Sequence, residues 1–266
     1  EGRRRGDGHG VQHEGLHPVR DEDQADARQK EHDEERVLVS RLTPERAPEF
    51  LAIAMQPIMS LHDPQGSLDF EVLLRARAPD GSAMPAGRVI SVAEAHGRVG
   101  VIDRWVLGTV LEWLDTHLAQ LTGTRFVTVN FSGASINDEQ FMADAYAMLR
   151  AHPRAAARLC AEITEGVALR DFTQTRRVLE RLREFDVKLA LDDFGAGYTS
   201  FMYLSDLQAD VIKIDGAIVE SAARLQLLCP AMAPGQGRLR LARAALAVEE
   251  VVAQGAGDGA EANLVA

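Results

Sequence analysis

Residues 37–220 alternate apolar, strand-like runs with amphipathic, helix-like stretches, and this alternation limits the folds open to the chain. Residues 171–185, for example, carry Val178, Leu182 and Phe185 at helical spacing. Strands that alternate with helices pair in parallel, with the helices as crossovers. The number of units predicts an α/β fold of the TIM-like (β/α)₈ barrel type. The strand-like runs are residues 51–59, 68–76, 125–132, 158–164, 187–193 and 210–215.

Two flanking segments lack this alternation. Residues 1–36 are dense in both signs of charge and have almost no apolar periodicity, which predicts a disordered segment or a solvated linker helix. Residues 221–266 are rich in Ala, Gly and Arg, and only residues 237–254 have the pattern of a helix. We therefore expect a barrel domain over residues 37–220, between a charged N-terminal segment and an atypical tail.

Composition excludes several classes of partner. The net charge of −11 argues against a nucleic-acid polymer or an anionic membrane surface as partner. No apolar run reaches the roughly 18 residues of a membrane helix, and the charged N-terminal residues do not resemble a signal peptide. Cys160 and Cys229 make no disulfide framework, so a reducing, cytoplasmic location is expected.

Polar residues close four successive strand-like runs. They are Asn130, Glu162, the pair Asp192 and Asp193, and Lys213, with spacings of 32, 30 and 21 residues between successive runs. Each spacing is about one βα unit. In a barrel the carboxyl ends of the strands meet at one face, where catalytic residues collect. The sequence therefore predicts a single polar site at that face.

Carboxylate and amide oxygens at this face predict a Mg²⁺ or Mn²⁺ site. A bound dication would remove the repulsion between Asp192 and Asp193, and two ions would stabilise a phosphoryl displacement. Glu71 adds a further carboxylate from an earlier strand. Lys213 would hold the nucleophilic water or neutralise the reacting phosphate, and Arg75 would bind a phosphate oxygen.

Each of these residues also has a purely structural interpretation. Asp192 and Asp193 could form a turn before Gly195, since Asp and Gly favour turns. Glu162 could pair with an arginine, and Asn130 could cap the segment that follows it. These alternatives stay open for single residues, but they do not account for acids and amides at successive strand ends.

At these residues the chain resembles the EAL domain family, the bacterial cyclic di-GMP phosphodiesterases. The resemblance runs from about residue 48 to 219, with Val72, Ala196 and Thr199 as departures. The matching segments are "QPI" at 56–58, "EVLLR" at 71–75, "VNFS" at 129–132, "EITE" at 162–165 and "LDDFGAGYTSFMYLSDLQADVIKID" at 191–215.

The resemblance implies an EAL-type barrel that hydrolyses one phosphodiester of cyclic di-GMP, with Lys213 positioning the water. It implies that Glu165 braces the loop after Asp193, which couples metal binding to homodimerisation, and that Ca²⁺ supports binding while suppressing cleavage. The implied metal ligands are Glu71, Asn130, Glu162, Asp192 and Asp193. The implied contacts to the dinucleotide are Gln56, Leu73, Arg75 and Asp215.

The resemblance stops after Ile218. The family continues with a strand that ends in Glu-Gly-Val-Glu and supplies a base or metal ligand, then a final strand. Here the nearest segment is "VVAQG" at 251–255, where Gln254 offers a neutral amide that cannot accept a proton. We therefore expect one or two strands to be lost and hydrolysis to be impaired. A reading frame different from the ancestral one would explain the change in composition.

Three other functions stay open. The chain could bind cyclic di-GMP without cleaving it, or be a non-functional truncated product. It could also be a different metal-dependent barrel enzyme, although the Gly-Ala-Gly-Tyr loop at 195–198 does not favour that interpretation.

Overall fold

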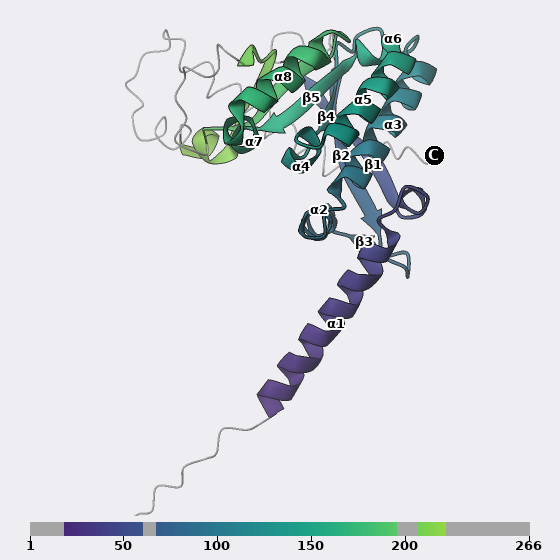
Figure 1. The fold of residues 1–266 in the computed structure, drawn as a ribbon, viewed down its shortest axis with the longest axis vertical. Coiled ribbons are helices and arrows are strands. Elements are labelled where there is room, and N and C mark those ends of the chain that lie inside the picture. The colour runs from purple at the N-terminus through teal and green to yellow at the C-terminus, as the bar shows by residue number, and fades with distance from the viewer. Residues whose placement is uncertain (1–18, 61–67, 196–206, 222–266) are drawn as a thin grey trace, which may run out of the picture.

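The computed structural model describes residues 19–60, 68–195 and 207–221, which form one mixed sheet with helices packed against it (Figure 1). The strand order along the sheet is β1-β2-β4-β5-β6-β7, and β3 pairs with β2. The strands are β1 (Leu51–Met59), β2 (Leu68–Arg77), β3 (Ala83–Met84), β4 (Val127–Asn130), β5 (Leu159–Thr164), β6 (Lys188–Phe194) and β7 (Val211–Ile214). All six strand-like runs are strands, which confirms the α/β class.

The first two strands depart from the parallel arrangement. β1 pairs antiparallel with β2, with Leu51 opposite Ala76 and Met59 opposite Leu68, whereas β2, β4, β5, β6 and β7 are joined in parallel. Eight residues, 60–67, separate β1 from β2, too few for a crossover helix. The prediction of parallel pairing was therefore wrong for this pair. Among the described strands the sheet does not close, because β1 and β7 lie at its two ends.

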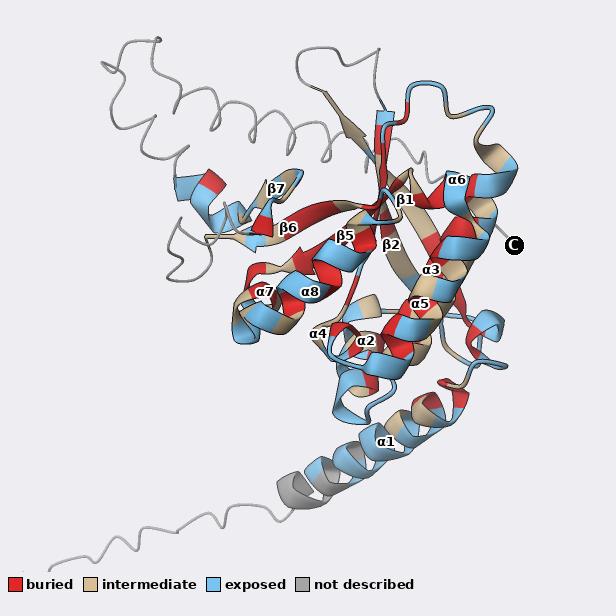
Figure 2. Cartoon of the chain, turned by 45° about the horizontal axis from the view of Figure 1, so that its top comes forward, coloured by how far each residue is buried: buried red, intermediate tan, exposed pale blue. Residues whose placement is uncertain are grey.

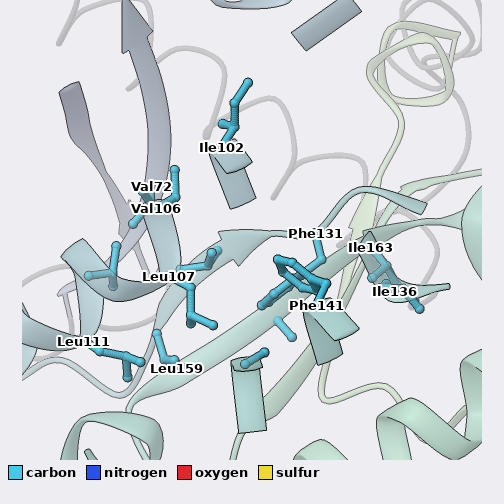
Figure 3. Packing of buried hydrophobic residues seen from close by; sticks show 14 of the residues in the cluster. Val72, Ile102, Val106, Leu107, Leu111, Phe131, Ile136, Phe141, Leu159 and Ile163 are labelled. Atoms are coloured by element: carbon cyan, nitrogen blue, oxygen red, sulfur yellow. The ribbon is translucent and has the colours of Figure 1, made fainter. Parts of the chain in front are cut away.

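The helices pack on one face of the sheet and bury the main core there. Alternate strand residues such as Val72, Leu159 and Ile163 point towards Leu107, Leu111 and other side chains of the helices (Figure 3). The helices are α1 (Val19–Arg41), α2 (Ala86–Ala95), α3 (Val99–His117), α4 (Gly133–Ile136), α5 (Glu139–Ala151), α6 (Pro153–Ala156), α7 (Glu165–Arg170) and α8 (Phe172–Arg183), with one 3-10 turn at Ala47–Glu49. None of those lying in the described ranges has the length and apolar content needed to cross a membrane.

The other face of the sheet, here called the interior face, has a small apolar floor. Phe126, Cys160 and Ala190 are buried together, with Ile58 and Val211 packed against them. Because strand side chains alternate between faces, Thr128, Glu162 and Asp192 belong to this same face, one step further along β4, β5 and β6. The interior face therefore carries a polar layer directly above its floor.

Helix α1 begins at Val19 and extends away from the sheet (Figure 1). Its described side chains are exposed until its last two turns, where Leu38 and Arg41 are buried (Figure 2). Of the two structures expected for residues 1–36, the linker helix is present from Val19 onward. It continues past the expected boundary at residue 36. Residues 1–18 lie outside the described part of the chain.

Candidate functional site

Lys213 of β7 lies among three carboxylates of the interior face. Its Nζ donates to Glu162 Oε1 at 2.5 Å and lies 2.9 Å from Glu71 Oε2 and 3.7 Å from Asp192 Oδ1. Lys213, Glu162 and Asp192 lie at or near the carboxyl ends of β7, β5 and β6, whereas Glu71 is the fourth of ten residues in β2. The predicted convergence of strand ends therefore exists for Glu162, Asp192 and Lys213, and Glu71 joins them from within β2.

Burial dominates the electrostatics of this cluster. Glu162 is fully buried, and the loss of hydration raises the pKa of its carboxyl to about 7 against the opposing effect of Lys213. Burial alone would lower the pKa of Lys213. The hydrogen bonds and charges of Glu162 and Glu71 outweigh it and raise that pKa above its usual value. The site thus keeps the Lys213 ammonium charged, while it makes ionisation of the buried Glu162 carboxyl less favourable.

Asp193 sits beside the cluster in a constrained backbone. Its φ of 54° lies in the left-handed region, which Asp tolerates better than most residues. Its pKa is raised by burial and then by the charges of Asp192 and Asp215, with Lys213 opposing. The neighbouring Asp192 therefore makes ionisation of Asp193 less favourable, as the sequence suggests.

Glu165 holds the start of the loop that follows β6. It is buried at the first position of α7, and its Oε2 accepts a hydrogen bond of 2.7 Å from the Gly195 N–H. Gly195 has φ of 95°, and a Cβ there would lie 2.2 Å from Ile218 Cδ1. The positive φ favours glycine here, and a Cβ would also require the exposed Ile218 side chain to move. Residues 196–206, the rest of the predicted loop motif, lie outside the described part of the chain.

Asn130 ends β4 with an exposed side chain, and its partner in register on β5 is Glu162. The turn after it is fixed by Asp103 of α3, whose buried carboxylate accepts from the Ser132 N–H at 3.0 Å. Burial raises the pKa of Asp103. The sequence does not single out this acid, because an Asp within an amphipathic helix resembles a solvent-facing residue.

The residues expected to contact a nucleotide line the same edge. Gln56 pairs in register with Glu71, and Leu73 and Arg75 follow Glu71 on the same face of β2. Arg75 is exposed, and its Nη1 donates to the carbonyl of Leu74 at 3.1 Å. Asp215 accepts from the Ala217 N–H at 2.8 Å, the geometry of a helix N-cap.

The donor set fits a hard divalent cation. Among the described residues no three Asp, Glu, His or Cys side chains form a ready-made metal group, since Lys213 lies between the carboxylates. However, Glu162 Oε2 is buried without a hydrogen-bond partner, and a buried carboxylate oxygen needs one. Carboxylate and amide oxygens are the ligands that Mg²⁺ and Mn²⁺ prefer. The residues present therefore suit such an ion.

A largely parallel sheet with acids and a lysine near its strand ends defines an α/β protein with its polar site at the carboxyl face of the sheet. The model of the EAL domain matches residues 45–233, so the chain belongs to the EAL domain family. This match agrees with the resemblance carried by the sequence motifs.

Curated relatives are named for one activity. The chain is 30% identical over 166 residues to the cyclic di-GMP phosphodiesterase PdeF of Escherichia coli strain K12, and the matched residues are 62% of this chain. It is 35% identical over 170 residues to the cyclic di-GMP phosphodiesterase NbdA of Pseudomonas aeruginosa, and these residues are 64% of this chain. The matched part spans only 22% of the length of either relative.

Solved structures share the fold and include nucleotide complexes. The PaMucR phosphodiesterase in complex with c-di-GMP superposes with a TM-score of 0.62 at 27% identity, covering 70% of this chain and 75% of that one. The FimX EAL domain from Pseudomonas aeruginosa bound to c-di-GMP gives 0.61 at 26% identity, covering 73% and 79%. Both are EAL-type folds, which are TIM-like barrels, and this confirms the fold class predicted from the sequence.

Proposed function

We propose that this chain binds cyclic di-GMP at the carboxyl face of its sheet and hydrolyses one phosphodiester to give the linear dinucleotide. The observation that carries the proposal is the Lys213 ammonium held among Glu71, Glu162 and Asp192. Relatives named as cyclic di-GMP phosphodiesterases support the choice of substrate. A cation among carboxylates at strand ends suits a reaction in which negative charge develops on a phosphate.

Five side chains would hold a Mg²⁺ or Mn²⁺ ion, and Glu162 would be the deepest of them. The other four are Glu71, Asn130, Asp192 and Asp193. When bound, the ion would polarise the phosphate and lower the pKa of a water molecule. Glu162 keeps one oxygen free of Lys213, so it can serve an ion without giving up its ion pair.

Lys213 would act on the attacking water and on the phosphate. Its three N–H donors are directed by strand β7 and by two carboxylates, so the ammonium is fixed in position rather than free to rotate. It would hold the water by a hydrogen bond and offset charge on the phosphate. Gln56, Leu73, Arg75 and Asp215 would contact the dinucleotide, Arg75 as a forked donor to a phosphate.

Glu165 would brace the loop after Asp193 through its bond to Gly195. In the same proposal this loop couples metal binding to pairing of two copies of the chain as a homodimer. The chain would work in the cytoplasm, as its use of cysteine suggests.

A second candidate is a domain that binds cyclic di-GMP without cleaving it. The sequence after Ile218 offers Gln254 where the family has a carboxylate, and this favours the second candidate or a slow enzyme. General acid–base assistance contributes about 10²–10⁴-fold to rate, so its loss would leave binding intact while turnover falls. Residues 222–266 lie outside the described part of the chain.

The test is product analysis of cyclic di-GMP incubated with the purified chain and Mn²⁺. Slow formation of the linear dinucleotide, below about 1 s⁻¹ and abolished by a chelator and by Glu71→Gln, would support hydrolysis. The matched control is Glu112→Gln, which changes an exposed acid of α3. Intact nucleotide that is nevertheless retained would support the second candidate. Neither binding nor product would overturn both.

A further inference from the structure

Two buried oxygens of the interior face have no hydrogen-bond partner among the described residues: Thr128 Oγ1 on β4 and Glu162 Oε2 on β5. Thr128 is 1% exposed and Glu162 is fully buried. Both belong to the polar layer above the floor of Phe126, Cys160 and Ala190. One is a hydroxyl that can donate, and the other is a carboxylate oxygen that can only accept.

Strand register brings these residues together. Thr128 pairs with Glu71 across β2 and β4 and with Cys160 across β4 and β5. Glu162 lies two residues beyond Cys160 on the same face of β5, so it is the diagonal neighbour of Thr128. The hydroxyl therefore lies beside one carboxylate of the proposed metal site and diagonal to another.

Packing alone does not explain a threonine at this position. Val127 and Val129 flank it, and valine has the same shape without a hydroxyl that must be buried. A buried hydroxyl without a partner costs free energy that valine would avoid. Lys213 uses Glu162 Oε1 and leaves Oε2 for a donor on the other side.

We propose that Thr128 is a positioning residue for Glu162 and acts through one bound water molecule. The Thr128 hydroxyl donates to the water, and the water donates to one lone pair of Glu162 Oε2, whose second lone pair remains for the metal ion. Buried waters typically bridge polar groups that the protein leaves unpaired. The bridge fixes the orientation of the carboxylate that would hold the metal, so this role rests on the proposed function.

The structure offers a matched control. Thr175 of α8 is also fully buried with an unpartnered hydroxyl, but it shares the apolar face of its helix with Val178 and Leu179. Thr128→Val and Thr175→Val thus remove the same atom from equally buried sites. Thr128→Ser restores the hydroxyl at the first site.

The experiment measures Mn²⁺ binding by calorimetric titration and, separately, thermal melting in chelator. Thr128→Val should weaken Mn²⁺ binding about 10–100-fold, the usual effect of losing a group that orients a metal ligand. Thr128→Ser and Thr175→Val should bind like the wild type. In chelator, Thr128→Val should lower the melting temperature only slightly, because it costs Glu162 one water-mediated hydrogen bond and leaves no cavity.

Three results would overturn the proposal. Unchanged Mn²⁺ affinity in Thr128→Val would remove the role of Thr128 alone. A loss of Mn²⁺ affinity in Thr175→Val equal to that in Thr128→Val would mean that removing any buried hydroxyl weakens binding, and Thr128 would have no positioning role. A wild-type chain that binds no Mn²⁺ would overturn the proposed metal site, and this role with it.

Discussion

Glu162 is the residue whose protonation most directly links the site to stability. Its pKa is about 7 in the folded chain against an ordinary 4.5, so the folded state binds more protons than the unfolded state between these values. Stability from this group is therefore greatest at low pH and falls as pH rises through that window. Lys213 stays charged throughout, because its own pKa is raised.

Glu162→Gln should remove this pH dependence in the metal-free protein. We expect the free energy of unfolding of the wild type to fall, relative to that of the variant, between about pH 5 and pH 7.5. Urea unfolding at both pH values in chelator measures it. Added Mn²⁺ should reverse the trend, because a metal binds the deprotonated carboxylate. A difference that does not change with pH would contradict the assigned shift.

Gly195 predicts a second effect at the residue scale. Gly195→Ala should cost about 1–2 kcal/mol, because a residue with a Cβ is strained at a φ of 95°. Gly166 of α7 is the control, since a Cβ there meets nothing within 4 Å. Gly166→Ala should be neutral or stabilising by up to about 1 kcal/mol. Equal losses at both positions, measured by urea unfolding, would contradict the argument.

At the scale of elements, α1 is tied to the sheet by its last turns. Arg41 Nη1 donates to the carbonyl of Arg77 at 3.0 Å, and its guanidinium lies 4.1 Å from the centre of the Phe50 ring. Arg77 ends β2, the strand that carries Glu71. Two further pairs join α1 to α2, Arg88 with Glu34 and His96 with Glu35, but these are half-exposed and stabilise little.

Arg41→Ala should therefore destabilise the fold by about 1–3 kcal/mol, through loss of a buried hydrogen bond and of the contact with Phe50. Arg36→Ala, five residues earlier, removes an exposed arginine with only a 4.0 Å pair to Asp33. It should change stability by less than about 0.5 kcal/mol. Denaturant unfolding of the wild type and the two variants measures both changes in the free energy of unfolding. Similar effects would mean that α1 is not held by its last turns.

The elements also show how far sequence could predict this fold. The six main strands were predictable because each is a largely apolar run of strand length. β3 was not, since Ala83 and Met84 carry no period. For the segment that became α1, polarity on every side is equally typical of a solvated helix and of disorder. The antiparallel pairing of β1 with β2 follows from the eight residues that join them, because so short a connection cannot form a crossover helix.

The site divides in the same way. Glu162, Asp192 and Lys213 were predictable because charged residues at buried strand ends are costly without a purpose, and Glu71 because it is a charge among apolar neighbours within a strand. Thr128 was not, because a β-branched residue inside a strand is ordinary and only its missing partner makes it notable. The Lys213 position between two carboxylates also needed the structure, since spacing in sequence gives the face of a strand but not a distance.

At the scale of the whole molecule, the described sheet ends at β7 with an apolar outer surface. Ile212 and Ile214 of β7 are 44% and 37% exposed. Apolar side chains on an end strand add no stability to the fold while they remain in water. A ligand that contacts β2, β5, β6 and β7 together would join strands from both ends of the sheet order, so the stability of this chain should respond strongly to ligand.

Cyclic di-GMP in Ca²⁺ should therefore raise the melting temperature of the intact chain. Ligand at 100 times its dissociation constant adds about 2.7 kcal/mol if only the folded state binds, or roughly 5–10 °C for a domain of this size. Linear dinucleotide and Ca²⁺ alone are the controls, and Glu71→Gln should reduce the shift. A cooperative transition that does not move would exclude a formed nucleotide site. A chain with no cooperative transition would mean that the described strands do not hold together without further structure, because an unclosed parallel sheet leaves too much apolar surface in water.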